Sequence, residues 1–372
     1  MRIAILGTRG IPNNYGGSET NAEILSPIFV QMGHDVTVYS PDEHPYRGDE
    51  WNGVKIRRIT CRESRFGIWA TLLYDYLCLR DAIRSEFDVI LELGYVPCAL
   101  FYPLWRRGTL LCTNMDGLEW KRSKWGPILR RFALLTERLA ARHSDVVIAD
   151  NPAIQDYHEE KYGRSSTYIS YGARLIEAPD PARLSDFGVE PGGYHLLIAR
   201  MEPENNIETI LDGHLLAASK APLLLVGKTS TRHAKQLLRR YGRDRGVRFL
   251  GGIYDYEVLS SLRCHARLYF HGHSVGGTNP SLLEAMATGA FIAAHDNPFN
   301  RAVLEDRALY FSSAADVARL LGGEHSHLRA VWVPANRQRI REKHTWRQAA
   351  EQHIAAFERG LAAQRAGVRS SG

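Results

Sequence analysis

The chain has 372 residues, of which 44% are hydrophobic and 24% are charged, a composition typical of a globular protein long enough for two domains. The formal net charge of +6 favours anionic ligands or an anionic surface over cationic ones. No apolar stretch is long enough to span a bilayer, so we expect any contact with a membrane to be made from its surface.

The first half of the chain alternates between apolar runs and helical patterns. The runs predict strands at residues 2–7, 34–40, 54–60, 88–94, 109–114, 145–150 and 167–172. The helical patterns include residues 19–32, with Ser18 as the expected cap, residues 69–85 and residues 127–143. Such alternation predicts a parallel sheet covered by helices on both faces.

Residues 173–193 are rich in proline and glycine and are expected to form a linker. The alternation then restarts, with strands expected at residues 194–200, 221–227, 247–250, 266–270 and 291–295. Helices are expected at residues 207–219, 231–243, 255–263, 279–288 and 313–321, followed by an amphipathic helix at 345–363. We expect an α/β fold with two Rossmann-like domains facing each other across a cleft. The predicted segments are residues 1–175, 176–345 and 346–372, the last packing back on the first domain.

The clearest motif lies between the strand at 266–270 and the helix at 279–288. Gly276 and Gly277 allow the backbone to come close to a ligand. Thr278 and Asn279 are good N-cap residues, and Pro280 suits the first helical position. A helix N-terminus presents free N–H groups and the positive end of a dipole. The motif therefore predicts an anion site, typically for a phosphate.

Three side chains could complete this site. Glu284 lies close enough to the start of the helix to bind a hydroxyl group. Arg200 ends the strand at 194–200, and its guanidinium could bind a diphosphate by charge-assisted hydrogen bonds. The alternative is a surface arginine paired with Glu202 or Glu204. Lys228, after the strand at 221–227, is a weaker candidate of the same kind.

Two carboxylates follow the strand at 109–114. Asp116 could accept a proton or orient an acceptor hydroxyl. The alternative is an aspartate that caps the turn before Gly117. Glu119 is a rival for the same role.

The first glycine loop does not have the dinucleotide fingerprint. Gly7-Thr-Arg-Gly10 departs from G-x-G-x-x-G, and although Asp35 could be nominated for the ribose, the glycine pattern already fails. A nicotinamide enzyme is therefore not favoured.

A metal site is not expected. Histidine pairs occur at residues 271 and 273 and at residues 325 and 327, and Asp255 and Glu257 form an acidic pair. No further carboxylate or cysteine cluster accompanies any of them. The five cysteines are scattered without a C-x-x-C pair, which is typical of a reduced cytoplasmic protein.

Residues 104–142 are strongly basic, and tryptophans are interleaved with the arginines and lysines. This mixture fits a surface that rests on anionic lipid headgroups. The alternative is a solvated helix face with buried aromatic residues. Nucleic acid is not expected as a partner, because no recognition motif is present.

Three stretches carry a resemblance to a known family. They are residues 7–20 (GTRGIPNNYGGSET), 116–125 (DGLEWKRSKW) and 273–287 (HSVGGTNPSLLEAMA), supported by residues 199–207. Together they resemble retaining glycosyltransferases of the GT-B architecture, in family 4. The resemblance is narrower to the rhamnosyltransferase-like branch that builds bacterial surface polysaccharides.

The resemblance implies a nucleotide-sugar donor held mainly by the second half. Glu284 matches the second glutamate of the E-x7-E motif, which binds the nucleotide ribose, whereas Gly276 stands where the first glutamate would fall. Asn205 replaces the lysine that follows the donor-site arginine in the broader family. The diphosphate is then expected to rely on Arg200 and the N–H groups at 277–279, with Gly16 and Gly17 as further donor-binding residues.

The resemblance also implies the reaction. We expect a metal-independent, cofactor-free transfer with retention, most simply of L-rhamnose from dTDP-rhamnose to a polyprenyl-diphosphate-linked or oligosaccharide acceptor. Asp116 and Arg200 are the expected catalytic residues, and Glu119 and Trp120 are expected at the acceptor. The enzyme would work in the cytoplasm, at the inner face of the plasma membrane. The alternatives are a nucleotide-sugar 2-epimerase of the same fold and a non-catalytic nucleotide-sugar-binding protein.

Overall fold

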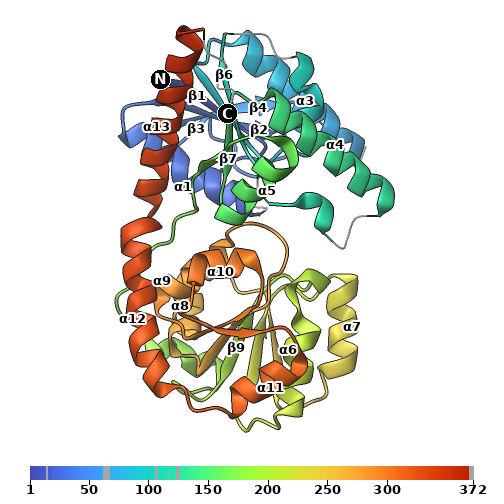
Figure 1. Cartoon of the computed structure of the whole chain (residues 1–372), viewed down its shortest axis with the longest axis vertical. Helices are drawn as coiled ribbons and strands as arrows, with labels where there is room; N and C mark the ends of the chain where they lie inside the picture. Colours follow the sequence, from blue (N-terminus) through green and yellow to red (C-terminus); the bar gives the residue numbers. More distant parts are fainter. Residues whose placement is uncertain (14–15, 62–67, 105–107, 116, 123–125, 368–372) are drawn as a thin grey trace. The chain divides into compact units, whose positions relative to one another are not determined.

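The computed structural model describes residues 1–13, 16–61, 68–104, 108–115, 117–122 and 126–367. The chain divides into two compact units, unit 1 being Met1–Tyr171 with Trp346–Gly372 and unit 2 being Gly172–Thr345. The sequence predicted boundaries after residues 175 and 345. Each unit contains its own sheet covered by helices (Figure 1).

Unit 1 has an eight-stranded sheet in the order β3-β4-β2-β1-β5-β6-β7-β8. Every pair of neighbours is parallel except β3 and β4, which are antiparallel at the edge. The strands are β1 (Arg2–Leu6), β2 (Asp35–Pro41), β3 (Glu50–Trp51), β4 (Val54–Ile59), β5 (Val89–Leu93), β6 (Leu110–Asn114), β7 (Val146–Ala149) and β8 (Thr167–Tyr168). The helices are α1 (Gly17–Gln31), α3 (Ile68–Arg84), α4 (Pro127–His143), α5 (Pro152–Tyr162) and α13 (Trp346–Arg365), with short 3-10 turns η1 (Cys98–Leu104) and η2 (Glu119–Lys121).

Strand β1 shows why both faces of this sheet are covered. Ile3 and Ile5 are buried in the cluster that includes α1 and α13, whereas Ala4 and Leu6 are buried in the cluster on the opposite face. Successive side chains of a strand point to opposite faces, so a strand that is apolar throughout requires helices on both.

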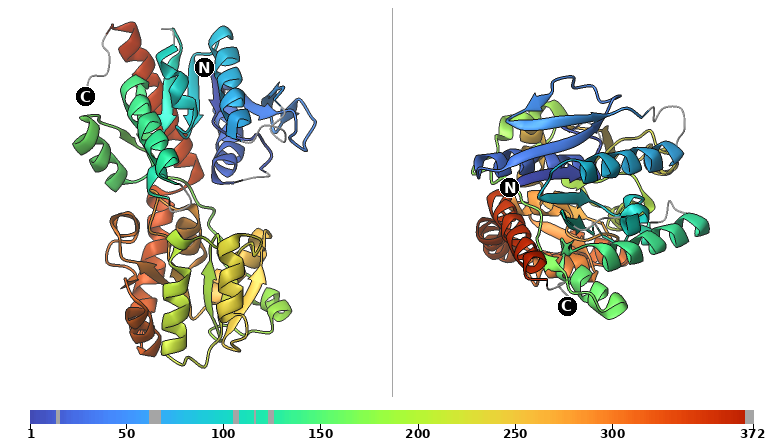
Figure 2. Two further views of the ribbon diagram at one scale, coloured as in Figure 1. Left: turned by 90° about the vertical axis from the view of Figure 1, so that its right-hand side faces the viewer. Right: turned by 90° about the horizontal axis from the view of Figure 1, so that it is seen from above.

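The C-terminal helix belongs to unit 1, as the sequence predicted. On α13, Phe357 packs edge-on against Phe29 of α1 with ring centroids 6.2 Å apart, and His353 lies 6.0 Å from the same ring. The two helices lie side by side in both views (Figures 1 and 2). Residues far apart in sequence therefore close the core of unit 1.

Unit 2 has a six-stranded parallel sheet in the order β11-β10-β9-β12-β13-β14. The strands are β9 (His195–Ile198), β10 (Leu223–Val226), β11 (Val247–Gly251), β12 (Leu268–His271), β13 (Ile292–His295) and β14 (Leu309–Phe311). The helices are α6 (Ile207–Leu216), α7 (Arg232–Tyr241), α8 (Tyr256–His265), α9 (Pro280–Thr288), α10 (Pro298–Leu304), α11 (Ala314–Gly322) and α12 (Ser326–Lys343), with 3-10 turns η3 (Pro181–Phe187) and η4 (Pro203–Asn205).

Several local expectations were wrong or incomplete. The sequence predicted neither the short strands β3 and β14 nor the helices α10 and α12, and α12 was obscured by Pro334 in its interior. The expected cap Ser18 lies inside α1, because the helix already starts at Gly17 and Gly16 is its N-cap. Gly16 caps with no side-chain hydrogen bond.

Two predictions from composition can be compared with the structure. No helix in the described part of the chain combines the length and the apolar character that a membrane span requires. All five cysteines are free thiols, and four of them are buried.

Candidate functional site

The donor-site residues predicted in unit 2 gather at one edge of its sheet. Strand β9 pairs in parallel with β10 on one side and with β12 on the other. Arg200 follows β9, Lys228 follows β10, and residues 272–279 follow β12. Since the carboxyl ends of adjacent parallel strands meet at the same edge, the fold brings these three segments together.

The start of α9 confirms the predicted helix signals. The side chain of Asn279 caps the helix and accepts a hydrogen bond from the N–H of Ser281 at 2.9 Å. Pro280 follows at the first helical position, and Gly289 ends the helix in the left-handed conformation. Gly276 has φ +119°, a backbone conformation that favours glycine. The glycine turn and the helix N-terminus together form a candidate anion site.

The loops that follow β9 and β12 are fastened to each other. The carbonyl of Glu204 accepts hydrogen bonds from the backbone N–H of Ser274 at 3.0 Å and from its hydroxyl at 2.8 Å. The amide of Asn206 donates to the carbonyl of Gly272 at 2.8 Å. A Cβ at Gly272 would overlap the carbonyl oxygen of Asn205, so this close approach requires glycine. We call these two loops the donor-loop clasp.

Arg200 lies at the start of the loop that follows β9, and its side chain is exposed. Its guanidinium forms no ion pair with any carboxylate in the described part of the chain, so the alternative of a surface pair with Glu202 or Glu204 is wrong. Asn205 is buried, and its side-chain amide donates a hydrogen bond to the Arg200 carbonyl at 2.6 Å. This asparagine therefore supports the loop.

Lys228 lies beside an exposed aromatic ring. Its ammonium nitrogen is 5.6 Å from the centroid of Tyr254, whose side chain is 72% exposed. A cation over an aromatic face is attracted to it. The pair places a second positive charge at the edge of the sheet that carries Arg200.

Glu284 forms an ion pair that the sequence did not predict. One of its carboxylate oxygens, Oε2, accepts a hydrogen bond from Nη2 of Arg263 at 2.5 Å. Arg263 comes from α8 and is 2% exposed, whereas Glu284 is 29% exposed. The sequence signals only that Arg263 shares a helix face with the apolar Leu259, four residues earlier, and it does not identify the partner.

One histidine, His271, ends β12, and a second, His273, follows it two residues later. His271 is fully buried and its ring stacks on that of His273, with centroids 4.4 Å apart and planes 18° apart. Burial, with His273 and Arg263 nearby, holds the pKa of His271 well below its usual range. The ring is therefore neutral at physiological pH.

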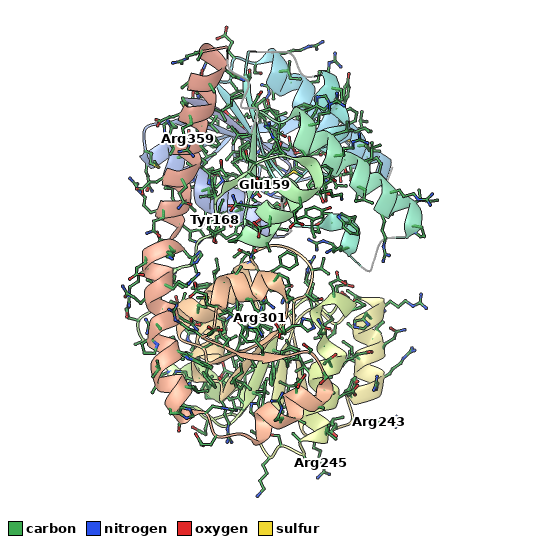
Figure 3. The ribbon with its side chains drawn as sticks, viewed as in Figure 1. Glu159, Tyr168, Arg243, Arg245, Arg301 and Arg359 are labelled. Carbon is green, nitrogen blue, oxygen red and sulfur yellow. The ribbon has the colours of Figure 1, made fainter. Side chains whose placement is uncertain are left out.

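The next loop along the sheet edge is held by α10. Asn297 and Asn300 each donate a hydrogen bond to the carbonyl of His273 at 3.0 Å. Arg301, which is labelled in Figure 3, forms a bidentate pair with Asp296 at 2.5 and 2.8 Å. These contacts link β13 to the loop that leads into the glycine turn.

In unit 1, a carboxylate from the first turn of α1 lies against the glycine loop that precedes the helix. Glu19 is buried, and its Oε1 accepts a hydrogen bond from the backbone N–H of Arg9 at 2.7 Å. A Cβ at Gly16 would lie 3.2 Å from the other oxygen of Glu19. An acidic side chain thus lies at the helix N-terminus where Gly16 and Gly17 were predicted to meet the donor.

The acceptor-side residues follow β6. Glu119 pairs with Arg122, with Oε1 and Nη2 2.5 Å apart. The indole N–H of Trp120 donates to the hydroxyl of Tyr157 at 3.2 Å. Asp116, the predicted catalytic carboxylate, lies outside the described residues.

A buried carboxylate that the sequence did not single out supports this acceptor loop (residues 117–122). Glu137 of α4 is fully buried and accepts hydrogen bonds from the hydroxyls of Tyr157 and Tyr162, both at 2.6 Å. It also pairs with Lys161 at 3.0 Å and accepts from Tyr95 at 3.2 Å. The hydroxyl of Tyr95 in turn accepts from the backbone N–H of residue 119 at 3.1 Å.

The residues that hinted at a metal have other roles. Asp255 caps α8, accepting hydrogen bonds from the N–H groups of Glu257 and Val258. His325 hydrogen-bonds to the carbonyl of Leu320 at 3.0 Å. Among the described residues, no group of three or more histidine, cysteine or acidic side chains is arranged to hold a metal ion.

One face of α4 combines apolar and basic side chains. Ile128 is 82% exposed and Leu135 is 48% exposed, and they share a helix face with the exposed Arg131, Arg138 and Arg142. None of these arginines forms an ion pair with the carboxylates that the structure describes. We call this the α4 face.

Two family models match the chain. Residues 1–174 match the model described as "Domain of unknown function (DUF1972)", and residues 213–355 match the model described as "Glycosyl transferase-like". A stretch of 57 residues is 44% identical to an "Uncharacterized 42.6 kDa protein in cps region" of Klebsiella pneumoniae. That match covers 15% of this chain and 15% of the relative.

Solved structures match nearly the whole chain. Sucrose-phosphate synthase from Thermosynechococcus elongatus is 17% identical with a TM-score of 0.80, covering 97% of this chain and 99% of that one. The Anabaena protein HepE, in complex with UDP, is 17% identical with a TM-score of 0.71, covering 96% and 100%. TarM is 11% identical with a TM-score of 0.73, covering 96% and 98%. At these identities the likeness establishes the fold, which is that of GT-B glycosyltransferases.

Proposed function

We propose that this chain, which has the fold of GT-B glycosyltransferases, is itself a glycosyltransferase that moves a sugar from a nucleotide-sugar donor to a lipid-linked or oligosaccharide acceptor, with retention of the anomeric configuration. The observation that carries the proposal is the convergence of Arg200, the glycine turn at 276–277 and the N-terminus of α9 at one sheet edge. A cation beside free N–H groups is suited to a diphosphate. Glu284, on the same helix, is suited to a ribose hydroxyl.

The donor side of the proposal assigns one group to each part of the nucleotide sugar. Arg200 and the N–H groups of residues 277–279 bind the diphosphate, Lys228 adds charge, and Glu284 binds the ribose. The Anabaena relative of the same fold was solved with UDP, with UDP and glucose, and with UDP-glucose. Our preferred donor is dTDP-rhamnose, which would supply L-rhamnose, because of the family resemblance of the sequence.

Gly276 supplies no carboxylate to the donor sugar, so the proposed chemistry relies on other groups. The acceptor hydroxyl forms a bond to the anomeric carbon on the face from which the diphosphate leaves, and the leaving phosphate takes the hydroxyl proton. Arg200 and the α9 dipole stabilise the charge that develops on the diphosphate, so a divalent metal is not needed. Asp116 is proposed to orient the reacting groups, with Gly16 and Gly17 contributing to the donor site.

Glu119 and Trp120 are proposed to form the acceptor side in unit 1. Because Glu119 pairs with Arg122, the carboxylate proposed to act at the hydroxyl is Asp116. The α4 face supports a polyprenyl-diphosphate-linked acceptor, since apolar and cationic side chains together suit an anionic lipid surface. We therefore place the protein in the cytoplasm, peripheral to the inner face of the plasma membrane. Surface-polysaccharide assembly is proposed from the family resemblance of the sequence.

The test separates this function from its two alternatives. A panel of dTDP-, UDP- and GDP-sugars is first screened for thermal stabilisation of the protein. The best donor is then assayed for nucleotide release with and without a polyprenyl-diphosphate-linked saccharide, in buffer with and without EDTA. Acceptor-dependent release that survives EDTA supports the proposal. An epimerised donor without acceptor indicates a 2-epimerase, and binding without turnover indicates a binding protein.

A further inference from the structure

Arg263 is a buried cation in contact with Glu284, the carboxylate proposed to bind the ribose. Its side chain is 2% exposed, and Nη2 contacts both Oε2 of Glu284 at 2.5 Å and the hydroxyl of Ser281 at 3.3 Å. The other guanidinium nitrogens, Nε and Nη1, have no hydrogen-bond partner in the described part of the chain. The carboxylate of Glu284 is thus the group that compensates the charge of this arginine.

Burying a guanidinium in this position destabilises the fold unless a counter-ion compensates its charge. Removing a charge from water carries a penalty of several kcal/mol, which only a well-placed counter-ion offsets. Burial alone would lower the pKa of Arg263, but Glu284 with Tyr269 and Tyr256 raises it. The side chain therefore stays positively charged, and its charge acts on Glu284 at every physiological pH.

The pair is also tied to the start of α9. The hydroxyl of Ser281 lies 3.0 Å from that of Tyr269 on β12, and the backbone N–H of Ser281 donates to the Asn279 cap. Arg263, reaching both Ser281 and Glu284, connects successive turns of the helix that begins at the anion site. The orientation of Glu284 is thereby coupled to the helix N-terminus.

We propose that Arg263 is a positioning residue for the nucleotide ribose. It holds Oε2 of Glu284 towards the interior and leaves Oε1 free to accept a hydrogen bond from a ribose hydroxyl. This inference rests on the proposed donor site. A carboxylate fixed before the nucleotide arrives loses less rotamer freedom on binding, so the hydrogen bond contributes more to affinity.

The experiment measures recognition of one ribose hydroxyl. Isothermal titration of the full chain compares dTDP with 3′-deoxythymidine diphosphate, and UDP with its 3′-deoxy analogue. Hydrogen bonds to charged groups change affinity by about 10-fold or more, so we expect the wild type to prefer the 3′-hydroxyl nucleotide by that factor. Arg263→Met and Arg263→Gln should reduce the preference to less than about 3-fold, as expected for an unfixed carboxylate.

A conservative variant and a matched control complete the test. Arg263→Lys restores the positive charge and should recover at least half of the lost preference on a logarithmic scale. Arg337→Met removes another largely buried arginine of unit 2, paired with Glu177, and should leave the preference unchanged. This control distinguishes positioning of the ribose carboxylate from a general loss of stability.

Each outcome decides one claim. A wild-type preference retained in Arg263→Gln, or a lysine variant no better than the glutamine variant, overturns the inference and leaves the proposed function standing. A wild type that binds none of the four nucleotides, or that binds the 3′-hydroxyl and 3′-deoxy forms equally, overturns the inference, and the proposed function is then decided separately by the panel of dTDP-, UDP- and GDP-sugars.

Discussion

The carboxylate of Glu137 lies 2.6 Å from the hydroxyl of Tyr157, and that hydroxyl also accepts the indole N–H of Trp120. A fully buried charge on α4 is thus linked in two steps to a residue proposed at the acceptor. Lys161 lies 5.2 Å from the Trp120 ring centroid and pairs with Glu137, which adds a second link. The acceptor loop is therefore supported by the interior of unit 1.

Removing this support should destabilise unit 1. In Glu137→Ala the hydroxyls of three tyrosines lose their carboxylate acceptor. A hydrogen bond to a charged group contributes about 1.5–3 kcal/mol, so the free energy of unfolding should fall by about 3 kcal/mol or more in urea titrations. Glu159→Ala is the matched control, since Glu159 is an exposed glutamate on the adjacent helix α5 (Figure 3). Equal stabilities of the two variants would show that the Glu137 network does not support the fold.

The donor-loop clasp predicts a sharp effect at one glycine. In Gly272→Ala the added methyl group would overlap the carbonyl oxygen of Asn205, forcing the loops after β9 and β12 apart. We expect a loss of about 1–3 kcal/mol of stability, as for other overpacked sites, together with weaker nucleotide binding. Gly322→Ala, where nothing lies within 4 Å of the new methyl group, should match the wild type in both measurements. Tight nucleotide binding by Gly272→Ala would contradict the importance of the clasp.

Burial of a histidine on α13 predicts acid sensitivity of unit 1. Burial lowers the pKa of His353 to about 4, whereas an exposed histidine has a pKa of about 6.5. Between these values the unfolded chain binds a proton that the folded chain does not. The free energy of unfolding should therefore fall as pH falls through this window, by up to about 1.4 kcal/mol per pH unit.

The variant His353→Gln isolates this contribution, because glutamine does not titrate. Urea titrations between about pH 7 and pH 4.5 should show a shallower pH dependence in His353→Gln than in the wild type. The exposed His327→Gln serves as the control and should follow the wild type. Parallel profiles for all three proteins would mean that His353 does not resist protonation in the folded state.

The α4 face predicts membrane binding that depends on two apolar residues. We expect the wild type to float with vesicles containing anionic lipids at low salt and Ile128→Ser/Leu135→Ser to bind more weakly, because the apolar contribution is lost. Val331→Ser is the control, as Val331 is 65% exposed on α12 of unit 2. If the wild type does not bind these vesicles, the α4 face is a solvated helix surface.

Much of the fold could be predicted because its strands are apolar runs bounded by glycine and polar residues. The strands β1, β6 and β12 lie within one or two residues of their predicted bounds. The elements that escaped prediction have weak local signals. Strand β14 has three residues, and α12 contains Pro334 and is mostly polar or charged beyond it. Their conformations depend on tertiary packing more than on local pattern.

The candidate site was predictable where backbone geometry defines it and not where partners are distant in sequence. Asn279, Pro280 and Gly289 carry local signals, and all three have the predicted roles in α9. The pair between Arg263 and Glu284 joins two helices and could be recognised only once the fold placed them together. The roles of Asp116, Arg200 and Glu284 in catalysis or donor binding stay predictions.

The most direct measurement of the central claim is transfer of radiolabelled L-rhamnose from dTDP-rhamnose to a polyprenyl-diphosphate-linked saccharide by the wild type, Arg200→Ala and Glu284→Ala. Arg200 is exposed, so Arg200→Ala should fold normally. Losing one group that stabilises the leaving diphosphate should lower its turnover by about 100-fold or more. Glu284→Ala should mainly weaken donor binding. Acceptor-dependent transfer by the wild type with these losses is the predicted result, whereas near-wild-type turnover in both variants would contradict the donor site proposed for unit 2.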